Sequence, residues 1–319
     1  MANEKLKIVS VENKAPTPAV LPPKSSRRAE IKQEMEALWQ EDPRQFDPNR
    51  DAMQRNRIAN TFSLIQQLAP LQGKRVADLG TGFGVLACKC REAGAYVDAV
   101  DIASQPLEKL RAKKIEGITP LQECMPATSL KDDFYDLVLC TEMVGYLKPK
   151  EYRIAISELS RIVKKEGRVV CSTPLDLKSD DALERFLALF ETEFTICATF
   201  FSYDFLLLKL CSFFEAPSKI VKNAKSPVLK KQSRWRSKAL YSKPSVFVCR
   251  LIGLLFEPAT NLLRQSEWIR NRLEKLSRLL WQQSGISHVI VAGERHPLNF
   301  PLPKKELPQE PKHKREVWE

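Results

Sequence analysis

The chain has 319 residues, a net charge of +12 and a hydrophobic content of 43%, which fits one large α/β domain with an addition, or two domains. It holds no run of eighteen uncharged apolar residues, so the sequence predicts no membrane-spanning helix, and its start lacks the apolar centre of a secretory signal. The eight cysteines form no Cys-x-x-Cys pair and lie far from the three histidines, which argues against a zinc site and favours reduced thiols in a cytoplasmic protein.

The basic charge is concentrated in one segment. Residues 207–285 contain sixteen Lys/Arg against four Glu, whereas the rest of the chain has 35 residues of each sign and is neutral. Residues 219–250 hold ten basic residues and no acid. The positive charge is therefore a property of this segment and not of the protein as a whole.

The N-terminal part predicts two helices that precede the main domain. Residues 1–26 are aperiodic and rich in Pro and Lys, which indicates disorder. Within 27–70, "SSRRAEIKQEMEALWQ" reads as a helix with Ser25 or Ser26 as its N-cap, and "AMQRNRIANTFSLIQQL" reads as a second helix. The loop between them contains Pro43 and Pro48.

Apolar strands then alternate with amphipathic helices over residues 71–206. This alternation is typical of a parallel, doubly wound sheet. We expect strands at 74–80, 95–102, 117–123, 134–144 and 168–174, and helices at 85–94, 104–114, 149–167 and 179–191. Two more strands, 194–205 and 287–295, complete a mostly parallel seven-stranded sheet.

The basic segment 207–285 lies between the last two strands and reads as a helical insertion, followed by the last strand within 286–296 and a disordered basic tail at 297–319. Its apolar stretches are interrupted by charges and read as too short to span a bilayer. The stretch 261–283 predicts one amphipathic helix with an apolar face, on which lie Leu262, Ile269, Leu273, Leu276 and Leu280. Arg264, Arg270, Lys275 and Arg278 fall elsewhere around it. An alternative reading is a helical lid over the active site with a solvated basic exterior.

A glycine-rich turn follows the first strand, in the stretch "VADLGTGFGVLA". Gly80, Gly82 and Gly84 depart from the dinucleotide spacing Gly-x-Gly-x-x-Gly, and Asp78 would repel a phosphate beside them. The turn therefore favours a ligand with positive charge. Asp101 ends the next strand, 21 residues after Gly80, where a carboxylate meets ribose hydroxyls. The blander alternative is that the glycines only allow close helix–strand packing.

Residues 74–174 resemble the class I S-adenosylmethionine-dependent methyltransferases. Within that class, their residue pattern is most similar to that of the ubiquinone-biosynthesis O-methyltransferases. "VADLGTGFG" resembles their first motif, "VDAVDIA" their second, and "LQECMPATSLKDDFYDLVLC" their third and fourth. The resemblance implies S-adenosylmethionine as cofactor, with Asp101 at the ribose and Ile102 against adenine. Cys124 stands where the family usually has an acid, and Met125 offers its backbone amide to the ring. The full set of implied cofactor residues is Arg57, Asp78, Gly80, Thr81, Gly82, Gly84, Asp101, Ile102, Cys124, Met125, Cys140 and Thr141.

The expected catalytic residues follow the fourth strand. The resembled O-methyltransferases have Glu-x-x-Glu-His there, which serves a metal and a catechol-like hydroxyl, whereas this chain has Glu142-Met143-Val144-Gly145-Tyr146. A cation would lose most of its ligands, so metal-independent chemistry is expected, with Glu142 and Tyr146 near the acceptor. Tyr146 as a packing residue is the alternative. The histidines lie at or beyond the last strand, which makes a histidine base unexpected.

The sequence thus favours a methyltransferase that acts on a small, lipid-like or membrane-associated acceptor. The basic insertion, with Trp268 and Trp281 among apolar residues, favours an anionic membrane surface as partner, with RNA less favoured. The alternatives are an RNA methyltransferase and a non-catalytic binding module of the same fold. The expected location is cytoplasmic, with peripheral membrane attachment as an addition.

Overall fold

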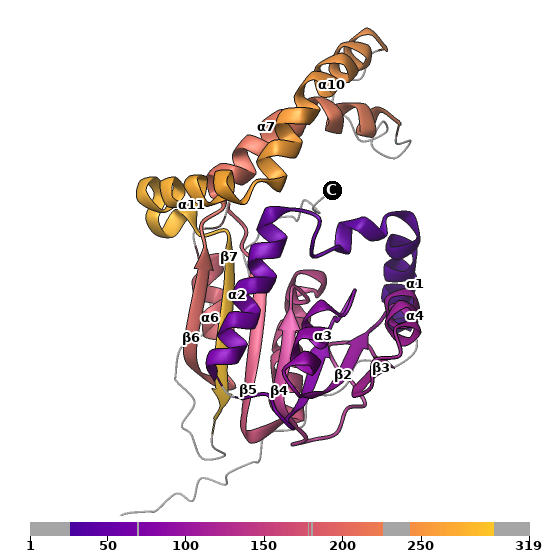
Figure 1. Cartoon of the computed structure of the whole chain (residues 1–319), viewed down its shortest axis with the longest axis vertical. Helices are drawn as coiled ribbons and strands as arrows, with labels where there is room; N and C mark the ends of the chain where they lie inside the picture. The colour runs from indigo at the N-terminus through magenta and orange to yellow at the C-terminus, as the bar shows by residue number, and fades with distance from the viewer. Residues whose placement is uncertain (1–25, 69, 178, 180, 226–242, 297–319) are drawn as a thin grey trace, which may run out of the picture.

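A computed structural model describes residues 26–68, 70–177, 179, 181–225 and 243–296. The disorder predicted for the N-terminal residues up to 25 and for the tail 297–319 lies outside the described residues. A seven-stranded sheet forms the centre, and a helical arm projects from one end of it (Figure 1). The fold class predicted from the sequence is confirmed.

The sheet has the strand order β3-β2-β1-β4-β5-β7-β6. Strands β1 to β5 pair in parallel, and β7 is antiparallel to both β5 and β6, so only one strand is reversed. The strands are β1 Arg75–Leu79, β2 Tyr96–Asp101, β3 Ile118–Gln122, β4 Tyr135–Thr141, β5 Val163–Pro174, β6 Phe194–Ser202 and β7 His288–Arg295.

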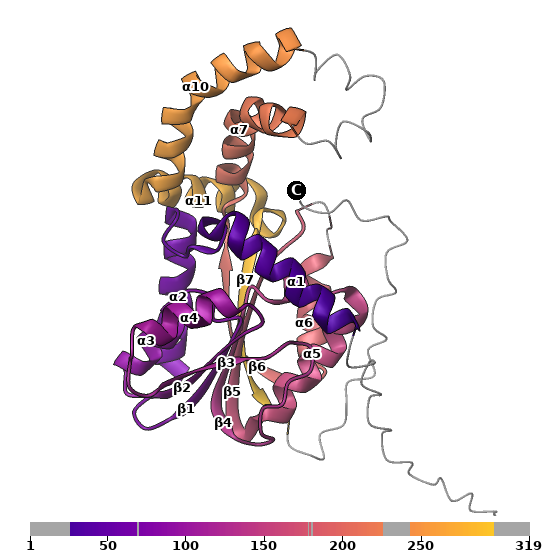
Figure 2. The ribbon, with the colours of Figure 1, turned by 90° about the vertical axis from the view of Figure 1, so that its right-hand side faces the viewer.

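Helices cover both faces of the sheet (Figure 2), because alternate residues of each strand point to opposite faces. Val76 belongs to the core beneath α2 (Ala52–Leu68), α3 (Val85–Glu92) and α4 (Ser104–Ala112). Ala77, the next residue, belongs to the core beneath α5 (Pro149–Ile162) and α6 (Ala182–Phe190). Two apolar layers thus hold the strand ends in fixed positions.

Some predicted boundaries are wrong: β4 ends at Thr141 and not at 144, β6 ends at Ser202 and not at 205, and the largest difference is at the start of β5. The helix expected over 149–167 ends at Ile162, and Val163 already begins β5. Val163 has extended backbone angles and pairs with Tyr135 of β4, across a register shift between Tyr135 and Leu137. Pairing with the buried end of β4 outweighs the helical pattern of "VKKEG" because Val163 is fully buried there.

The N-terminal helices reach over the edge where the parallel strands end. The helix α1 (Ser26–Glu41) is joined to α2 by the short helix η1 (Pro43–Phe46). Trp39, at the end of α1, is 2% exposed and stacks on Phe46 with ring centroids 4.6 Å apart. It also meets Phe83 of the glycine turn at 5.1 Å. These aromatic contacts fasten α1 over the turn.

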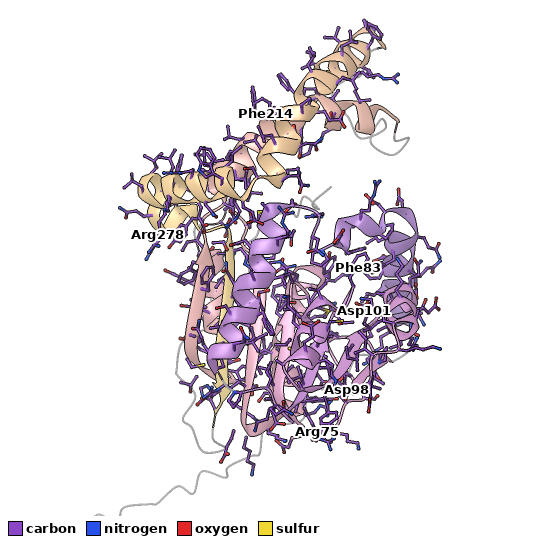
Figure 3. The ribbon with its side chains drawn as sticks, in the orientation of Figure 1. Arg75, Phe83, Asp98, Asp101, Phe214 and Arg278 are labelled. Atoms are coloured by element: carbon purple, nitrogen blue, oxygen red, sulfur yellow. The ribbon has the colours of Figure 1, made fainter. Side chains whose placement is uncertain are left out.

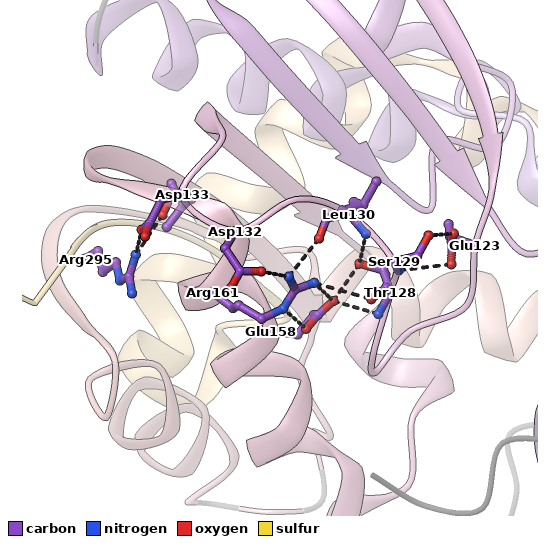
Figure 4. A network of polar contacts seen from close by, with 10 residues as sticks. Glu123, Thr128, Ser129, Leu130, Asp132, Asp133, Glu158, Arg161 and Arg295 are labelled. Atoms are coloured by element: carbon purple, nitrogen blue, oxygen red, sulfur yellow. Dashed lines mark hydrogen bonds and ion pairs between the residues drawn. The ribbon is translucent and has the colours of Figure 1, made fainter. Parts of the chain in front are cut away.

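The connection between β3 and β4 is held by a polar network on α5 (Figure 4). Glu158 accepts hydrogen bonds from the Thr128 backbone at 2.6 Å and from Arg161, which also donates to the Leu130 carbonyl at 2.7 Å. Asp132 pairs with the same guanidinium. The network immobilises the segment that follows Cys124 and Met125.

The insertion between β6 and β7 consists of α7 (Phe205–Lys225), α10 (Lys243–Gln265), α11 (Glu267–Trp281) and the short helix η3 (Gln282–Gly285). The single helix predicted over 261–283 is wrong, because the chain breaks at Ser266. The Ser266 hydroxyl accepts from the Ile269 N–H and caps α11.

The face on which α11 packs also differs from the prediction. Arg270, expected at the surface, is 1% exposed, and its Nε lies 3.0 Å from Oδ1 of the equally buried Asp204. Glu274 adds a second contact to Arg270 at 3.1 Å. Leu276 and Leu280, on the apolar face for which the sequence favours a membrane surface, are 42% and 58% exposed and do not anchor the helix. A buried ion pair, and not an apolar stripe, therefore anchors α11 to the end of β6.

The length of α10 corrects a further expectation. Within α10, the 22 residues Pro244–Gln265 are, by length and composition only, the one candidate span in the described part of the chain. At 1.5 Å a residue it measures about 33 Å. The sequence reading took this stretch to be broken at Arg250, whereas the helix continues through that residue.

Candidate functional site

A cavity of about 570 Å³ opens at the carboxyl ends of β1, β2 and β4, beneath α1. Its volume lies in the range of small-molecule sites. The switch in strand order between β1 and β4 lies at this edge, which is where open α/β sheets bind ligands. Figure 3 shows Asp101 and Phe83 on this side of the sheet, whereas Phe214 and Arg278 lie on the projecting helices.

The glycine turn presents bare backbone to the cavity. Gly80, Gly82 and Gly84 have φ angles of +74°, +51° and +72°, a left-handed conformation that a side chain disfavours. A Cβ on Gly80 would also lie 2.4 Å from Cγ of Met143. The turn therefore needs glycine for its backbone angles and, at Gly80, for space as well.

Asp78 lies at the end of β1 and lines the cavity although it is only 2% exposed. The Thr81 hydroxyl donates to its Oδ2 at 2.7 Å. Burial raises the pKa of Asp78 to about 6, against the hydrogen bond from Thr81, and the nearby charge of Asp101 raises it further. This carboxyl group titrates near neutral pH and would be most stable as an anion beside a positive charge.

Asp101 ends β2 and faces the same cavity. Its Oδ2 accepts from the Gly82 N–H at 3.0 Å and its Oδ1 from the Ala103 N–H at 2.9 Å. Burial raises its pKa, while these backbone donors lower it. The two hydrogen bonds fix the carboxylate against the glycine turn, and each oxygen keeps capacity for a ligand hydroxyl.

At the opposite wall, Glu142 is the centre of a charged cluster. His288 Nε2 lies 2.5 Å from its Oε1, Ser172 Oγ donates to the same oxygen at 2.8 Å, and Arg57 Nη1 is 3.5 Å away. Burial would raise the pKa of Glu142, but His288, followed by Arg57 and Ser172, lowers it to about 2. Glu142 is therefore an ionised carboxylate at neutral pH.

The backbone of Glu142 is strained as well. Its φ is +63°, which is uncommon for a residue other than glycine, and its N–H donates to the Ser172 carbonyl at 3.0 Å. Strain of this kind concentrates at functional sites. Tyr146, one turn later, also lines the cavity, and its partial burial and the charge of Glu142 raise the pKa of its phenol, which stays protonated and able to donate.

The cavity brings together twelve of the fourteen predicted site residues: Arg57, Asp78, Gly80, Thr81, Gly82, Asp101, Ile102, Cys124, Met125, Thr141, Glu142 and Tyr146. Gly84 does not line it, because Gly84 packs against Leu110 of α4. Cys140 does not line it either. Its side chain points into the core beneath α5 and α6, opposite Cys171, because residues of a strand alternate between the two faces.

The expectation that no histidine lies near the site is wrong. His288 begins β7, and β7 is antiparallel to β5, so its first residue lies where the parallel strands end. The sequence reading placed the last strand correctly but made no prediction of its direction, which decides where His288 lies. Reasoning from the strands also missed Trp39 and the other wall residues of α1; only the apolar spacing of that helix pointed to a buried face.

Comparison with known proteins agrees with this geometry. Residues 53–209, about half of the chain, match a family described as a methyltransferase domain. The chain is 33% identical over 120 residues to a ubiquinone biosynthesis O-methyltransferase from Paracidovorax citrulli, covering 34% of this chain and 47% of the relative. A protein of the same name from Vibrio atlanticus is 30% identical over 153 residues, 46% of this chain and 61% of the relative. The chain thus spans about half the length of such curated relatives.

Among solved structures, a S-adenosylmethionine-dependent methyltransferase from Mesorhizobium loti is 27% identical, with a TM-score of 0.33, over 36% of this chain and 52% of that chain. The N-methyltransferase NodS from Bradyrhizobium japonicum, solved with S-adenosylhomocysteine, is 17% identical with a TM-score of 0.45, over 54% of this chain and 89% of that chain. The matched residues include the glycine turn, Asp101 and the cavity wall from Gln54 to Lys148, but not the wall formed by α1. The chain belongs to the class I S-adenosylmethionine-dependent methyltransferases.

Proposed function

We propose that the protein transfers a methyl group from S-adenosylmethionine to a hydroxyl oxygen of a small, lipid-like acceptor, without a metal ion. The observation that carries the proposal is one cavity whose two walls both carry carboxyl groups, in different surroundings. Asp78 and Asp101 flank bare backbone at one wall, and an ionised Glu142 lies at the other. The name of the relatives, O-methyltransferase, supports oxygen as the acceptor atom.

The residues at the first wall fit the cofactor. Asp101, held by two backbone N–H groups, would bind the ribose hydroxyls, and Ile102 would lie against the adenine. Asp78 would face the positively charged methionine end, which favours its ionised form. The cofactor supplies a methyl group on a positively charged sulfur, which is already a good leaving group. What remains for the protein is to align the acceptor, exclude water and take up a proton.

Glu142 is the residue we assign to the proton. A hydroxyl becomes strongly acidic as its oxygen is methylated, so the Glu142 carboxylate can accept its proton although its pKa is only about 2, and the proton then passes on to solvent. His288 and Ser172 hold the carboxylate in one orientation, and Tyr146 can donate a hydrogen bond to the acceptor. Glu142 and Tyr146 are the catalytic residues in this proposal, and His288 is a positioning residue.

The proposal that methyl transfer needs no metal ion is based on the charged groups around Glu142. Arg57 and His288 already lie beside Glu142, and a divalent cation at that carboxylate would meet the Arg57 guanidinium 3.5 Å away. We also propose a cytoplasmic location. The eight cysteines, all of which are described, are free thiols, as expected in a reducing compartment.

Two measurements test the proposal. Calorimetric titration of the full chain with S-adenosylmethionine should give one site, and Asp101→Ala should weaken it at least tenfold. Methyl transfer to a panel of amphipathic phenols and alcohols, followed by formation of S-adenosylhomocysteine, should depend on Glu142. The absence of cofactor binding would refute the enzyme function; binding without any transfer would favour a non-catalytic module.

A further inference from the structure

The helices α7 and α10 form a hairpin that projects beyond the sheet and its covering helices (Figures 1 and 2). One face of α10 is used within the hairpin. Phe256 packs on Phe213 and Phe214 of α7, with ring centroids 6.4 and 5.1 Å apart. Gly253 lies so close to Ser218 that an added Cβ would approach its Oγ to 2.8 Å. The hairpin is therefore a packed unit with a defined inner side.

The opposite face of α10 has no cover in the described part of the chain. Its side chains recur at the helical period and lie on one side of the helix. They are large, apolar and exposed: Phe247, Val248, Leu251, Leu254, Leu255 and Leu262, between 49% and 77% of whose surface is open. Only 6% of the most apolar part of this helix is buried. An apolar strip of this length marks a surface that binds something apolar.

The charge of this part of the sequence favours one kind of partner. Residues 219–250 contain ten basic residues and no acid, and of these Lys219 on α7 and Arg250 on α10 have described, exposed side chains. At the other end, α11 exposes Trp268, Leu276, Leu279 and Leu280, and Arg272 lies over the Trp268 ring at 5.5 Å. Tryptophan beside basic residues and leucines is typical of helices in the headgroup region. An anionic lipid surface offers both the apolar layer and the negative charge that this arrangement matches.

The topology favours a helix that lies in the membrane surface over one that crosses it. The chain leaves the sheet through α7 and returns through α10, so a crossing by α10 would require α7 to cross as well. α7 carries Lys209, Glu215 and Lys219, and Arg264 of α10 pairs with Glu215. Such charges are costly in the bilayer core, whereas they fit an interfacial position.

The hairpin is joined to the rim of the cavity. Gln265, the last residue of α10, donates through Nε2 to the Arg50 carbonyl at 2.6 Å, and Arg50 lines the cavity. Arg55 donates to the Gln265 carbonyl at 2.8 Å and pairs with Glu267 of α11 at 3.2 Å. A membrane bound along α10 would thus lie beside the entrance to the site.

We propose that the exposed face of α10, together with the Trp268 end of α11, docks on an anionic lipid surface and lies in its headgroup region. This proposal rests on the proposed function in one respect, since the docked surface would supply the lipid-like acceptor. Docking itself depends only on the exposed apolar strip and the basic residues around it.

The test is co-sedimentation of the full chain with vesicles of phosphatidylcholine alone or mixed with phosphatidylglycerol. We expect at least tenfold stronger binding to the mixed vesicles. The variant Leu251→Gln/Leu255→Gln should bind mixed vesicles at least tenfold more weakly, because it removes apolar surface from the docking face. Both side chains are exposed, so we expect the variant to fold like the wild type. The matched control Tyr96→Gln/Phe200→Gln, which removes exposed aromatic side chains from the sheet, should bind within twofold of the wild type.

Two further results would overturn the docking proposal. One is binding to mixed vesicles that the Leu251→Gln/Leu255→Gln variant leaves unchanged. The other is a wild-type protein that does not bind vesicles but instead forms a concentration-dependent dimer or retains RNA, when the same substitutions abolish that dimer or RNA retention. Cofactor titration of each variant separates the two proposals: vesicle binding without cofactor binding refutes only the enzyme function, and intact cofactor binding without vesicle binding refutes only docking.

Discussion

Cofactor affinity should depend on pH through Asp78. Its carboxyl is 2% exposed and its pKa is raised to about 6, so it is ionised at pH 7 and largely protonated at pH 5. S-adenosylmethionine keeps its positive charges across this range. If only the ionised form of Asp78 binds the cofactor, the competent fraction falls from about 90% to about 9%, a tenfold loss equal to about 1.4 kcal/mol.

The assay is calorimetric titration at half-unit steps from pH 5 to pH 7.5. Thr81→Val sharpens the test, because the Thr81 hydroxyl lowers the pKa of Asp78 through a 2.7 Å hydrogen bond. Its loss should move the midpoint of the affinity curve to higher pH. Asp78→Asn should bind more weakly and without this pH dependence. A wild-type affinity that stays constant from pH 5 to pH 7 would refute the electrostatic reasoning.

The free energy of unfolding gives the control for this experiment, because it should fall as the pH rises, whereas the cofactor affinity should increase. A pKa of about 6 in the folded chain against 3.8 for the free group means that ionisation of Asp78 destabilises the fold. The contribution of protonated Asp78 to the free energy of unfolding is fully present below pH 3.8. It is lost as the pH rises through 6, and the loss is about 3 kcal/mol at most. Asp78→Asn should therefore unfold at pH 7 at the same temperature as the wild type or higher, so weaker binding would not reflect unfolding.

Three other substitutions test separate parts of the structure. Glu142→Gln should lower the rate of methyl transfer about 10²- to 10⁴-fold and leave cofactor affinity within twofold, measured by S-adenosylhomocysteine formation and by calorimetry; an unchanged rate would remove Glu142 from the mechanism. Gly80→Ala should destabilise the fold by about 1–3 kcal/mol in urea denaturation, because its φ is +74° and the new Cβ would meet Met143; a wild-type midpoint would contradict the close approach of Met143 to the turn. Arg270→Ala should cost about 3–5 kcal/mol in the same assay, since it leaves Asp204 buried without its cation, and a loss below about 1 kcal/mol would show that the pair is not an anchor.

The sequence was sufficient for the parts of the fold that local pattern determines. Strand and helix alternation, the left-handed glycine turn and the two strand-end carboxylates follow from residue type and spacing within short stretches. Twelve of the fourteen predicted site residues line one cavity, most of them because they follow the carboxyl ends of neighbouring strands. Cys140 failed for a reason of the same kind: it lies one residue before the strand end, and that shift turns its side chain to the other face.

The parts that the sequence did not predict depend on contacts between distant segments. His288 lies 146 positions after Glu142, and only the reversed direction of β7 brings the two side chains to 2.5 Å. Helical periodicity assigned Arg270 to the solvent, because a pattern of apolar residues cannot reveal that Asp204 lies opposite a cation in the folded chain.

The same limit explains why the character of α10 was underestimated. Periodicity describes which side chains share a face of a helix, but not whether that face is covered. Within α10, the face with Gly253 and Phe256 packs on α7, whereas the face with Leu251 and Leu255 stays exposed, and both faces are apolar. A helix that is apolar on both faces belongs in a protein core or against lipid, and the described chain covers only one of them. Within the described residues the open face has no cover, which is why we propose it, and not the inner face, as the docking surface.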